Sequence, residues 1–400
     1  MLAAVLIFAG TYVVLAVGRL PGLRLDRTGA AIVGASLMLA FNVLTVEEAY
    51  AAINYDTIIL LFGMMIVVAN LRLSGFFALV SAWVVEHAHA PLVLLSGIVL
   101  VAGVFSAFFV NDTMCLVLTP LVLEITRRLG RRPVPYLLAV AMASNIGSVA
   151  TITGNPQNMM IGSFSQIPYR TFAAALAPVA AAGLAITIAV IALLYRAEFR
   201  GASRLVVEHP QVRVNRVLLA KSLAVSAAMI VLFFAGWPVP KVAVVAGALL
   251  LLTRRIKPER VYREIDWSLL VMFIGLFIVI AGIEKTPLPG DLFAAAGRFH
   301  LERVWPMSVF AALLANLFSN VPAVLVFKTF VPHLADPVRA WLTLAMSSTL
   351  AGNLTLLGSV ANLIVAQRAR GQAEISFREH ARTGIPLTIV TIAVGVWMLN

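Results

Sequence analysis

The sequence has little cysteine and little charge. Its one cysteine, Cys115, excludes an internal disulfide, and the apolar run around it indicates a packing role. Charged residues make up 12% of the chain, whereas soluble domains carry about 25%. The sequence shows no converging His/Asp/Glu set or Ser/Lys pair of the kind that an intramembrane enzyme needs. It also shows no repeated motif that resembles the selectivity filter of a channel. We therefore expect neither an enzyme nor a channel.

Hydrophobic residues are abundant instead, at 61% of the 400 residues. Many windows reach the roughly 20 apolar residues that cross a bilayer core. The net charge of +12 could indicate a nucleic-acid partner, but the basic residues stand in loops between apolar runs. Basic loops are typical of the cytoplasmic side of membrane proteins. The expected partner is therefore the lipid bilayer, and no nucleic acid is expected.

The first apolar run begins without a basic segment, because the first arginine, Arg19, follows it. This order argues against a cleaved signal peptide and indicates a first spanning helix with its N-terminus outside. We expect a multi-pass protein of a bacterial-type cytoplasmic (inner) membrane.

The chain repeats itself after about 210 residues, with at least five similar segments in the same order. FFVNDTMCLVLTPLV aligns with LFSNVPAVLVFKTFV and places Asn111 on Asn320. SNIGSVATITGNPQN aligns with STLAGNLTLLGSVAN, and the pairs in this second alignment are Ser144 with Ser348, Thr151 with Thr355, Gly154 with Gly358 and Asn158 with Asn362.

Ten apolar segments are long enough, whole or with a break, to cross a bilayer. They are residues 2–18, 30–45, 56–71, 137–163, 173–194, 217–235, 242–253, 267–283, 340–366 and 383–399. The loops on one side hold 22 of the 30 Lys and Arg residues, and the opposite loops hold 6. This excess predicts that the first side faces the cytoplasm.

This division of the loops between two sides requires that residues 91–124 and 305–333 do not cross the membrane. Each segment must enter and leave on the same side. Each has the length of two half-spans that meet at a polar tip, VNDT (110–113) or SNVP (319–322). We therefore expect two re-entrant hairpins, the first opening inward and the second outward, in an inverted-topology repeat. The expected units are a first repeat, a basic cytoplasmic linker and a second repeat, at 1–195, 196–216 and 217–400. Charge on one side of 76–89 and 292–302 predicts interfacial amphipathic helices.

The predicted fold is thus an all-α polytopic membrane protein with about ten transmembrane helices, the two hairpins and two unwound helices. Gly147, Gly154 and Pro156 fall inside a predicted span, which they are expected to unwind. An unwound span exposes N–H groups that attract anions and carbonyls that coordinate Na⁺. Neutral Ser, Thr and Asn oxygens gather in both breaks; a small-residue packing interface is the alternative interpretation.

Asp112 is the one acidic residue expected near the bilayer midplane, where carboxylates are costly and usually functional. It could ligate a cation, carry a proton or serve as a structural acid, and its counterpart is Val321. Lys328 could face an anion, neutralise Asp112 or snorkel to the surface. The six histidines show no metal-ligand spacing and are expected at the interface.

These motifs resemble the ion transporter superfamily, which includes divalent anion/sodium symporters, citrate transporters and arsenite-efflux permeases of the ArsB type. The similarity covers nearly the whole chain and is most specific in NDTMCLVLTPLV, ASNIGSVATITGNPQN and SNVPAVL. It implies hairpins and unwound helices that meet at a midplane site, an elevator-like transport domain and a homodimer. No cofactor is expected besides Na⁺ or H⁺ as the coupling ion.

Carried over residue by residue, the resemblance implies two groups of site residues. The cation or coupling group is Asn111, Asp112, Ser144, Asn145, Gly147, Asn158, Gly352 and Asn353, with Na⁺ expected at the first four of these. The substrate group is Thr113, Thr151, Gly154, Asn155, Ser319, Asn320, Thr349, Thr355 and Asn362.

The two hairpin tips differ from the paired Ser-Asn-Thr signatures with which the divalent anion/sodium symporters bind substrate carboxylates. A carboxylate at Asp112 would repel a dianion. The arsenite permeases share the Asn-Asp tip but differ at TGNPQN. We therefore expect a secondary transporter that moves a small inorganic or carboxylate anion with Na⁺ or H⁺. The alternatives are arsenite or antimonite efflux and Na⁺/H⁺ antiport.

Overall fold

The computed structural model describes residues 2–17, 25–199, 214–288, 290, 294 and 297–400, and within these ranges it contains helices and no strands. Six described helices are long and apolar enough to cross a membrane. They are α4 (Tyr55–Ser74), α6 (Pro91–Phe108), α10 (Tyr169–Leu194), α12 (Arg216–Phe234), α15 (Trp267–Glu284) and α21 (Phe377–Leu399). The predicted all-α polytopic class is confirmed.

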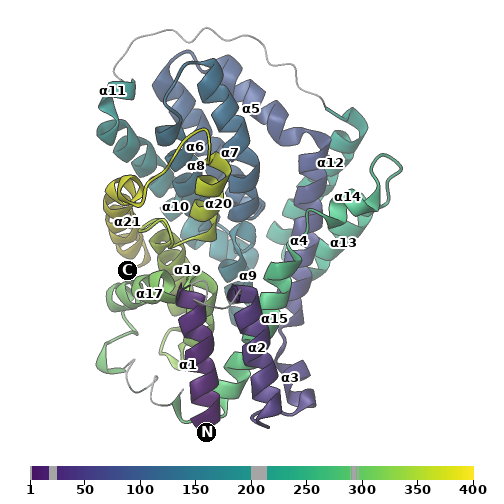
Figure 1. Cartoon of the computed structure of the whole chain (residues 1–400), viewed down its shortest axis with the longest axis vertical. Helices are drawn as coiled ribbons and strands as arrows, with labels where there is room; N and C mark the ends of the chain where they lie inside the picture. Colours follow the sequence, from purple (N-terminus) through teal and green to yellow (C-terminus); the bar gives the residue numbers. More distant parts are fainter. Residues whose placement is uncertain (1, 18–24, 200–213, 289, 291–293, 295–296) are drawn as a thin grey trace.

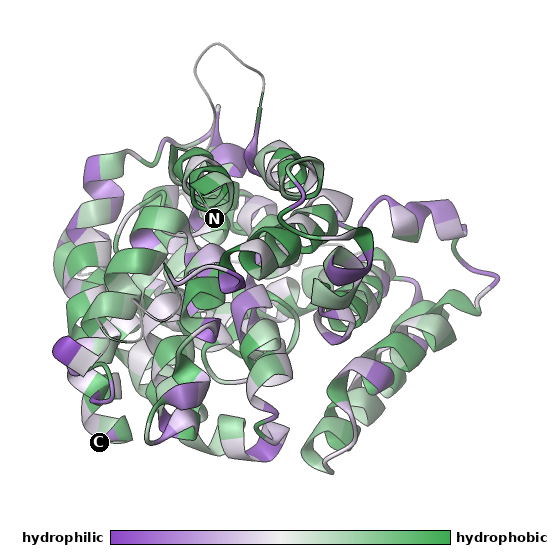
Figure 2. Ribbon diagram, turned by 90° about the horizontal axis from the view of Figure 1, so that it is seen from below, coloured by the Kyte–Doolittle hydropathy of each residue, from purple (hydrophilic) through white to green (hydrophobic). Residues whose placement is uncertain are grey.

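Shorter helices complete the described part of the chain (Figure 1). The apolar ones of 10–17 residues are α1 (Leu2–Val17), α2 (Arg27–Ala40), α5 (Phe76–His87), α13 (Val239–Leu251) and α17 (Val304–Phe318). Connecting elements are α3 (Val46–Ala52), α11 (Arg196–Phe199), α14 (Pro258–Tyr262) and the 3₁₀ turn η2 (Val331–His333). Figure 2 shows hydrophobic residues along most helices and hydrophilic residues concentrated in the connecting segments.

We call α1, α2, α4, α12, α13 and α15 the frame. Its helices cross closely at small residues: a Cβ on Gly63 of α4 would lie 2.6 Å from the carbonyl carbon of Ala243 in α13. A Cβ on Gly275 of α15 would lie 2.7 Å from that of Ala31 in α2. Small residues at such crossings let two backbones approach, which is how membrane helices gain van der Waals contact. The two crossings therefore need glycine at matching places in the two parts of the chain.

We call the helices α6–α10 and α17–α21 the core bundle, which adds α7 (Asn111–Arg128) and α8 (Pro133–Ser148). Its other members are α9 (Pro156–Ser165), α18 (Asn320–Lys328), α19 (Pro337–Ala351) and α20 (Val360–Ala369). Helix α8 is buried at every position from Pro135 to Ser148, with α6, α7, α10 and α20 packed against it. In Figure 1 the bundle lies on the left and α4, α12 and α13 on the right.

Helical hairpins stand at both predicted places. Helices α6 and α7 meet at Phe109–Val110, and α17 and α18 meet at Ser319. The residue before each tip asparagine has a positive φ, +57° at Val110 and +77° at Ser319. A β-branched residue in that region is a backbone outlier, a form of strain found at functional sites. The re-entrant course of the hairpins, the inverted orientation and the domain limits stay predictions.

Both predicted helix breaks are present. Helix α8 ends at Ser148, a 3₁₀ turn (η1) covers Ile152–Gly154, and α9 begins at Pro156. Helix α19 ends at Ala351 and α20 begins at Val360. We call residues 149–155 the first break and 352–359 the second break. Ser144, Asn145 and Gly147 remain helical, so they line the end of a helix and not the unwound backbone.

Some of the other predictions concern residues that the structure does not describe. Residues 200–213 of the predicted linker and residues 292, 293, 295 and 296 of a predicted interfacial helix lie outside them. Cys115 is buried and free, as its packing role required. The expectation of interfacial histidines is wrong for His380, which is 1% exposed. Its position in the first turn of α21 did not reveal its burial, which depends on the helices packed on α21, among them α10 and α19.

Candidate functional site

The two breaks are closed by one asparagine each. In the first break, the Asn158 side chain donates to the carbonyl oxygens of Ser148 and Thr151, each at 3.0 Å. In the second, Asn362 donates to those of Gly352 at 2.8 Å and Thr355 at 3.1 Å. Both asparagines thus satisfy the carbonyls 10 and 7 residues before them. Unwound backbone inside a membrane protein persists only with such partners.

Each break is also tied to its hairpin by a threonine. The Thr151 hydroxyl donates to the carbonyl of Ala107 near the end of α6. The Thr355 hydroxyl donates to Oδ1 of Asn316 near the end of α17, at 3.3 Å, and Asn316 donates to the carbonyl of Ala351 at 2.8 Å. Thr151 and Thr355, both predicted to bind substrate, therefore hold the hairpins against the breaks.

Asn145 joins the two parts of the site. Its Oδ1 accepts from Asn111 at the first tip, at 2.9 Å, and from the Ser359 hydroxyl at 3.0 Å. Its Nδ2 donates to Oδ1 of Asn353 at 2.8 Å and of Asn362 at 3.1 Å. The carboxamide has two donors and two acceptor lone pairs, so all four positions are used. We call these five residues the amide cluster; Asn145 organises it.

A second link runs between α9 and α19. The Thr349 hydroxyl accepts from Asn155 at 3.2 Å and from Gln157 at 3.1 Å. Asn155 also begins α9 as its N-cap, accepting from the backbone N–H of Asn158, and donates to the Ser148 hydroxyl at 2.8 Å. The two breaks, nearly 200 residues apart in sequence, therefore form a single polar centre.

Three buried asparagine side-chain oxygens of this centre have no hydrogen-bond partner in the described part of the chain. They are Oδ1 of Asn111, Asn158 and Asn320. The Ser144 hydroxyl is buried too and lies beside the Cys115 thiol. A buried acceptor without a donor is costly unless another group satisfies it. Neutral oxygens of this kind suit Na⁺, a hydroxylated solute or water.

Asp112 lies in the first turn of α7, where the helix N-terminus favours a negative charge. It is half-buried and makes no hydrogen bond or ion pair with the residues that the structure describes. The carboxylate of Asp266, the N-cap of α15, is close enough to repel it. This repulsion opposes ionisation of Asp112 and would be relieved by a proton or a cation at its carboxylate.

Two of the predicted glycines are required by space. A Cβ on Gly147 would strike the backbone of Gly103 in α6, and one on Gly154 would strike the carbonyl of Ser148. Gly352 is less confined, with Nδ2 of Asn320 3.5 Å from its ideal Cβ. Gly147 and Gly154 therefore act through close packing.

The second break is the more accessible one. All side chains from Val149 to Asn155 are buried, whereas Leu357 in the second break is 60% exposed and Val360, which begins α20, is 40% exposed. Thr113 and Ser319 at the tips are half-buried, as is Thr355. A solute can therefore approach the centre from the second break and the tips more readily than from the first.

Lys328 does not neutralise Asp112. Its Nζ lies 2.9 Å from Oε1 of Glu284 at the end of α15 and 5.5 Å from the ring centre of Phe164. Near the same hairpin, the Tyr12 hydroxyl of α1 donates to the carbonyl of Pro322, at 3.0 Å. Both contacts join α18 to the frame.

Sequence reasoning missed Gln157, Asn316 and Tyr12. Asn316 could have been found, because it is the counterpart of Ala107 at the 209-residue offset of the tips. Gln157 was inside the quoted TGNPQN motif but has no polar counterpart in the second half. Tyr12 gave no signal, since one tyrosine in an apolar helix is ordinary.

Comparison with known proteins agrees with a transporter fold. A family model described as citrate transporter (CitMHS) matches residues 12–351. The silicon efflux transporter LSI3 of Oryza sativa subsp. japonica is 31% identical, over 95% of this chain and 93% of its own. The 46 kDa membrane protein of Mycobacterium leprae is 29% identical, over 99% and 97%.

More distant similarities extend the pattern. The putative transporter arsB of Dictyostelium discoideum is 23% identical, over 94% of this chain and 87% of its own. The crystal structure of the Alcanivorax borkumensis YdaH transporter, titled as having an unusual topology, superposes with a TM-score of 0.61 at 14% identity. That alignment covers 100% of this chain and 96% of the other, so the folds are alike from end to end.

Proposed function

This chain belongs to the citrate transporter family of membrane transporters, and on that premise we propose that it is a secondary active transporter coupled to Na⁺ or H⁺. It is a multi-pass membrane protein and a transporter, not an enzyme. The proposed cargo is a small weak oxyacid of the size of silicic or arsenous acid. The observation that carries the proposal is the amide cluster, through which Asn145 near the end of α8 joins the second break to the first tip.

The chemistry of the centre favours a solute with little charge. Its polar groups are carboxamides, hydroxyls and backbone groups, and the nearby cation Lys328 is paired with Glu284. The tips carry one ionisable side chain, Asp112, which repels a dianion. Silicic and arsenous acids are weak acids rich in hydroxyl groups, which amides can bind without a counter-charge. The names of the rice and Dictyostelium relatives support the same class.

We assign coupling to the region between the first tip and α8. Asp112 and the unpartnered oxygens of Asn111 and Asn158 could hold Na⁺, or Asp112 could carry a proton. Asn145 positions Asn111 beside these groups, because its fully bonded carboxamide accepts from the Asn111 side chain. The substrate is assigned to the second tip, at Ser319 and Asn320, and the accessible second break.

Movement is proposed as an elevator in which the core bundle slides against the frame. Polar contacts between them join Tyr12 with Pro322, Lys328 with Glu284 and Ser163 with Asn54, beside aromatic contacts such as Phe164 with Phe277. The proposed motion requires these polar contacts to exchange partners, which exposed ion pairs and single hydrogen bonds can do at modest cost. A homodimer in a bacterial-type inner membrane, with the N-terminus outside, completes the proposal.

A binding assay tests the proposed cargo. The purified protein is heated with silicate, arsenite or citrate, each with and without Na⁺, because a ligand that binds the folded state raises the unfolding temperature. We expect stabilisation by silicate or arsenite, and its loss in Asn320→Leu. Stabilisation by citrate alone would replace this cargo with the tricarboxylate of the family name. A response to Na⁺ and pH without any solute would favour Na⁺/H⁺ antiport at Asp112.

A further inference from the structure

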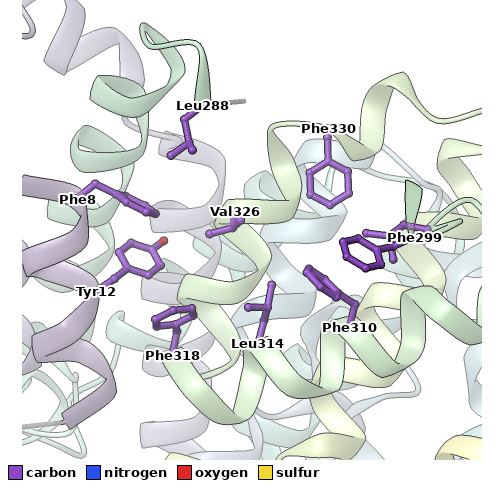
Figure 3. A pocket seen from close by; sticks show the side chains of 10 residues that line it. Phe8, Tyr12, Leu288, Phe299, Phe310, Leu314, Phe318, Val326 and Phe330 are labelled. Carbon is purple, nitrogen blue, oxygen red and sulfur yellow. The ribbon is translucent and has the colours of Figure 1, made fainter. Parts of the chain in front are cut away.

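An apolar cavity of about 300 Å³ lies between α1 of the frame and the second hairpin, away from the amide cluster. Figure 3 shows the side chains of Tyr12, Phe310, Leu314, Phe318 and Val326 turned toward this shared space. Phe310, Leu314 and Phe318 follow one another at intervals of four, so they form one stripe along α17. One face of α17 thus forms one wall of the cavity, opposite α1.

Water is a poor occupant of this cavity. Liquid water takes about 30 Å³ per molecule, so the space equals about ten waters. The one polar lining group is the Tyr12 hydroxyl, and it already donates to the carbonyl of Pro322 at 3.0 Å. A water needs two to four polar partners, and an apolar cavity that lacks them stays dry or takes up hydrocarbon. In a protein that lies in a bilayer, the hydrocarbon at hand is a lipid chain.

The cavity has a closed inner end and an open mouth. Tyr12 at the inner end is 2% exposed, and its ring packs edge-on against Phe318, with centres 5.3 Å apart. Phe299 at the other end is 60% exposed. In Figure 3 these two residues stand on opposite sides of the cavity. A flexible chain could therefore enter past Phe299 and end against Tyr12.

The mouth carries groups that suit a phosphate. Arg298 and Arg303 are exposed on the segment that supplies Phe299 to the lining. The acidic residue between them, Glu302, is bonded to His300 at 3.1 Å. Trp305, 58% exposed, follows, and exposed tryptophans are enriched at the membrane–water interface. Guanidinium groups bind phosphate oxygens well, and basic groups beside a hydrophobic crevice are a recurring lipid headgroup site.

We propose that this cavity binds one acyl chain of a membrane phospholipid, whose phosphate lies at Arg298 and Arg303. The lipid sits between the frame and the second hairpin and shields the Tyr12–Pro322 hydrogen bond from the bilayer. This lipid site is separate from the site of the transported solute. The proposal does not depend on which solute the protein carries.

Photolabelling tests the site. The protein is reconstituted into vesicles containing phosphatidylglycerol with a diazirine near the end of one acyl chain, illuminated and digested, and labelled peptides are identified by mass spectrometry. We expect label on peptides with Tyr12, Leu314 and Val326, in excess over the lipid-facing side of α12 at Val231, which is 65% exposed. Equal labelling of both regions would overturn the proposal, because it would mean general contact with lipid.

Paired variants sharpen the result. Leu314→Trp fills the cavity and should abolish the excess label. Leu313→Trp, at a neighbouring residue that is 63% exposed, should keep it. Val326→Phe serves if Leu314→Trp does not fold. The double variant Arg298→Gln/Arg303→Gln should lose the preference for phosphatidylglycerol over its neutral-headgroup analogue. Unchanged labelling in the filled variants would contradict a lipid site.

Discussion

Asn145 in α8 donates a hydrogen bond to Asn362 in α20, with Nδ2 and Oδ1 3.1 Å apart. The same Asn362 closes the second break, and the same Asn145 holds Asn111 at the first tip. A displacement at the first tip therefore reaches the second break through two side chains. Coupling between a cation and a solute needs such a connection between their sites.

Replacement of Asn145 by alanine tests this connection. The substitution removes four hydrogen bonds and leaves buried partners unsatisfied, so we expect loss of transport and a lower unfolding temperature. A double-mutant cycle with Asn362→Ala should be strongly non-additive, with a coupling energy of about 0.5–3 kcal/mol from thermal unfolding. Additive effects would mean that the two residues act independently.

Asn158 and Asn362 should both be sensitive to replacement. Alanine at either position strips two carbonyls of a break of their donor, and each unsatisfied group costs about 1–3 kcal/mol. The matched control is Asn70→Ala, because buried Asn70 donates only to Ile66 inside the continuous helix α4. Unfolding monitored by circular dichroism should show large decreases for the first two variants and a small one for the control. If Asn70→Ala lowered the stability as much as Asn158→Ala and Asn362→Ala do, the asparagines of the breaks would have no special role in stability.

The sequence predicted the helical class, both breaks and both tips, because Gly, Pro, Ser and Asn are conspicuous among apolar residues. It did not predict which polar groups face one another. Asn155 and Thr349 lie 194 residues apart, and only the packing of α9 against α19 brings them together. The role of Lys328 could not be assigned from the sequence, because its partner, Glu284, lies in α15, where no motif drew attention to it. His380 was misplaced because burial depends on the neighbours of α21.

Restraining the core bundle should stop transport. Asn54 at the start of α4 and Ser163 in α9 are bonded at 2.9 Å across the boundary with the frame. With both replaced by cysteine in a Cys115→Ala background, a short bifunctional thiol reagent should block flux, and a reducible linker should let reductant restore it. The physical reason is that an elevator must break this contact.

A second cysteine pair is the control for this experiment. Arg72 in α4 and Glu264, two residues before the N-cap of α15, form an ion pair whose two partners belong with the frame. Cross-linking Arg72→Cys to Glu264→Cys should leave flux unchanged, since these residues move together. Continued flux in the cross-linked Asn54/Ser163 pair would exclude a sliding motion there.

Gradient-driven flux of arsenite or silicate into proteoliposomes, with wild type and Asp112→Asn compared, tests the central claim most directly. Glu124→Gln is the matched control, because Glu124 lies on the same helix but pairs with Arg127 and Arg128 at the surface. We predict that an imposed Na⁺ or pH gradient drives accumulation in wild type and in Glu124→Gln. We predict no driven accumulation in Asp112→Asn, although it stays folded. Equal driven accumulation in Asp112→Asn, or no gradient-driven flux in wild type, would contradict cation-coupled transport through this site.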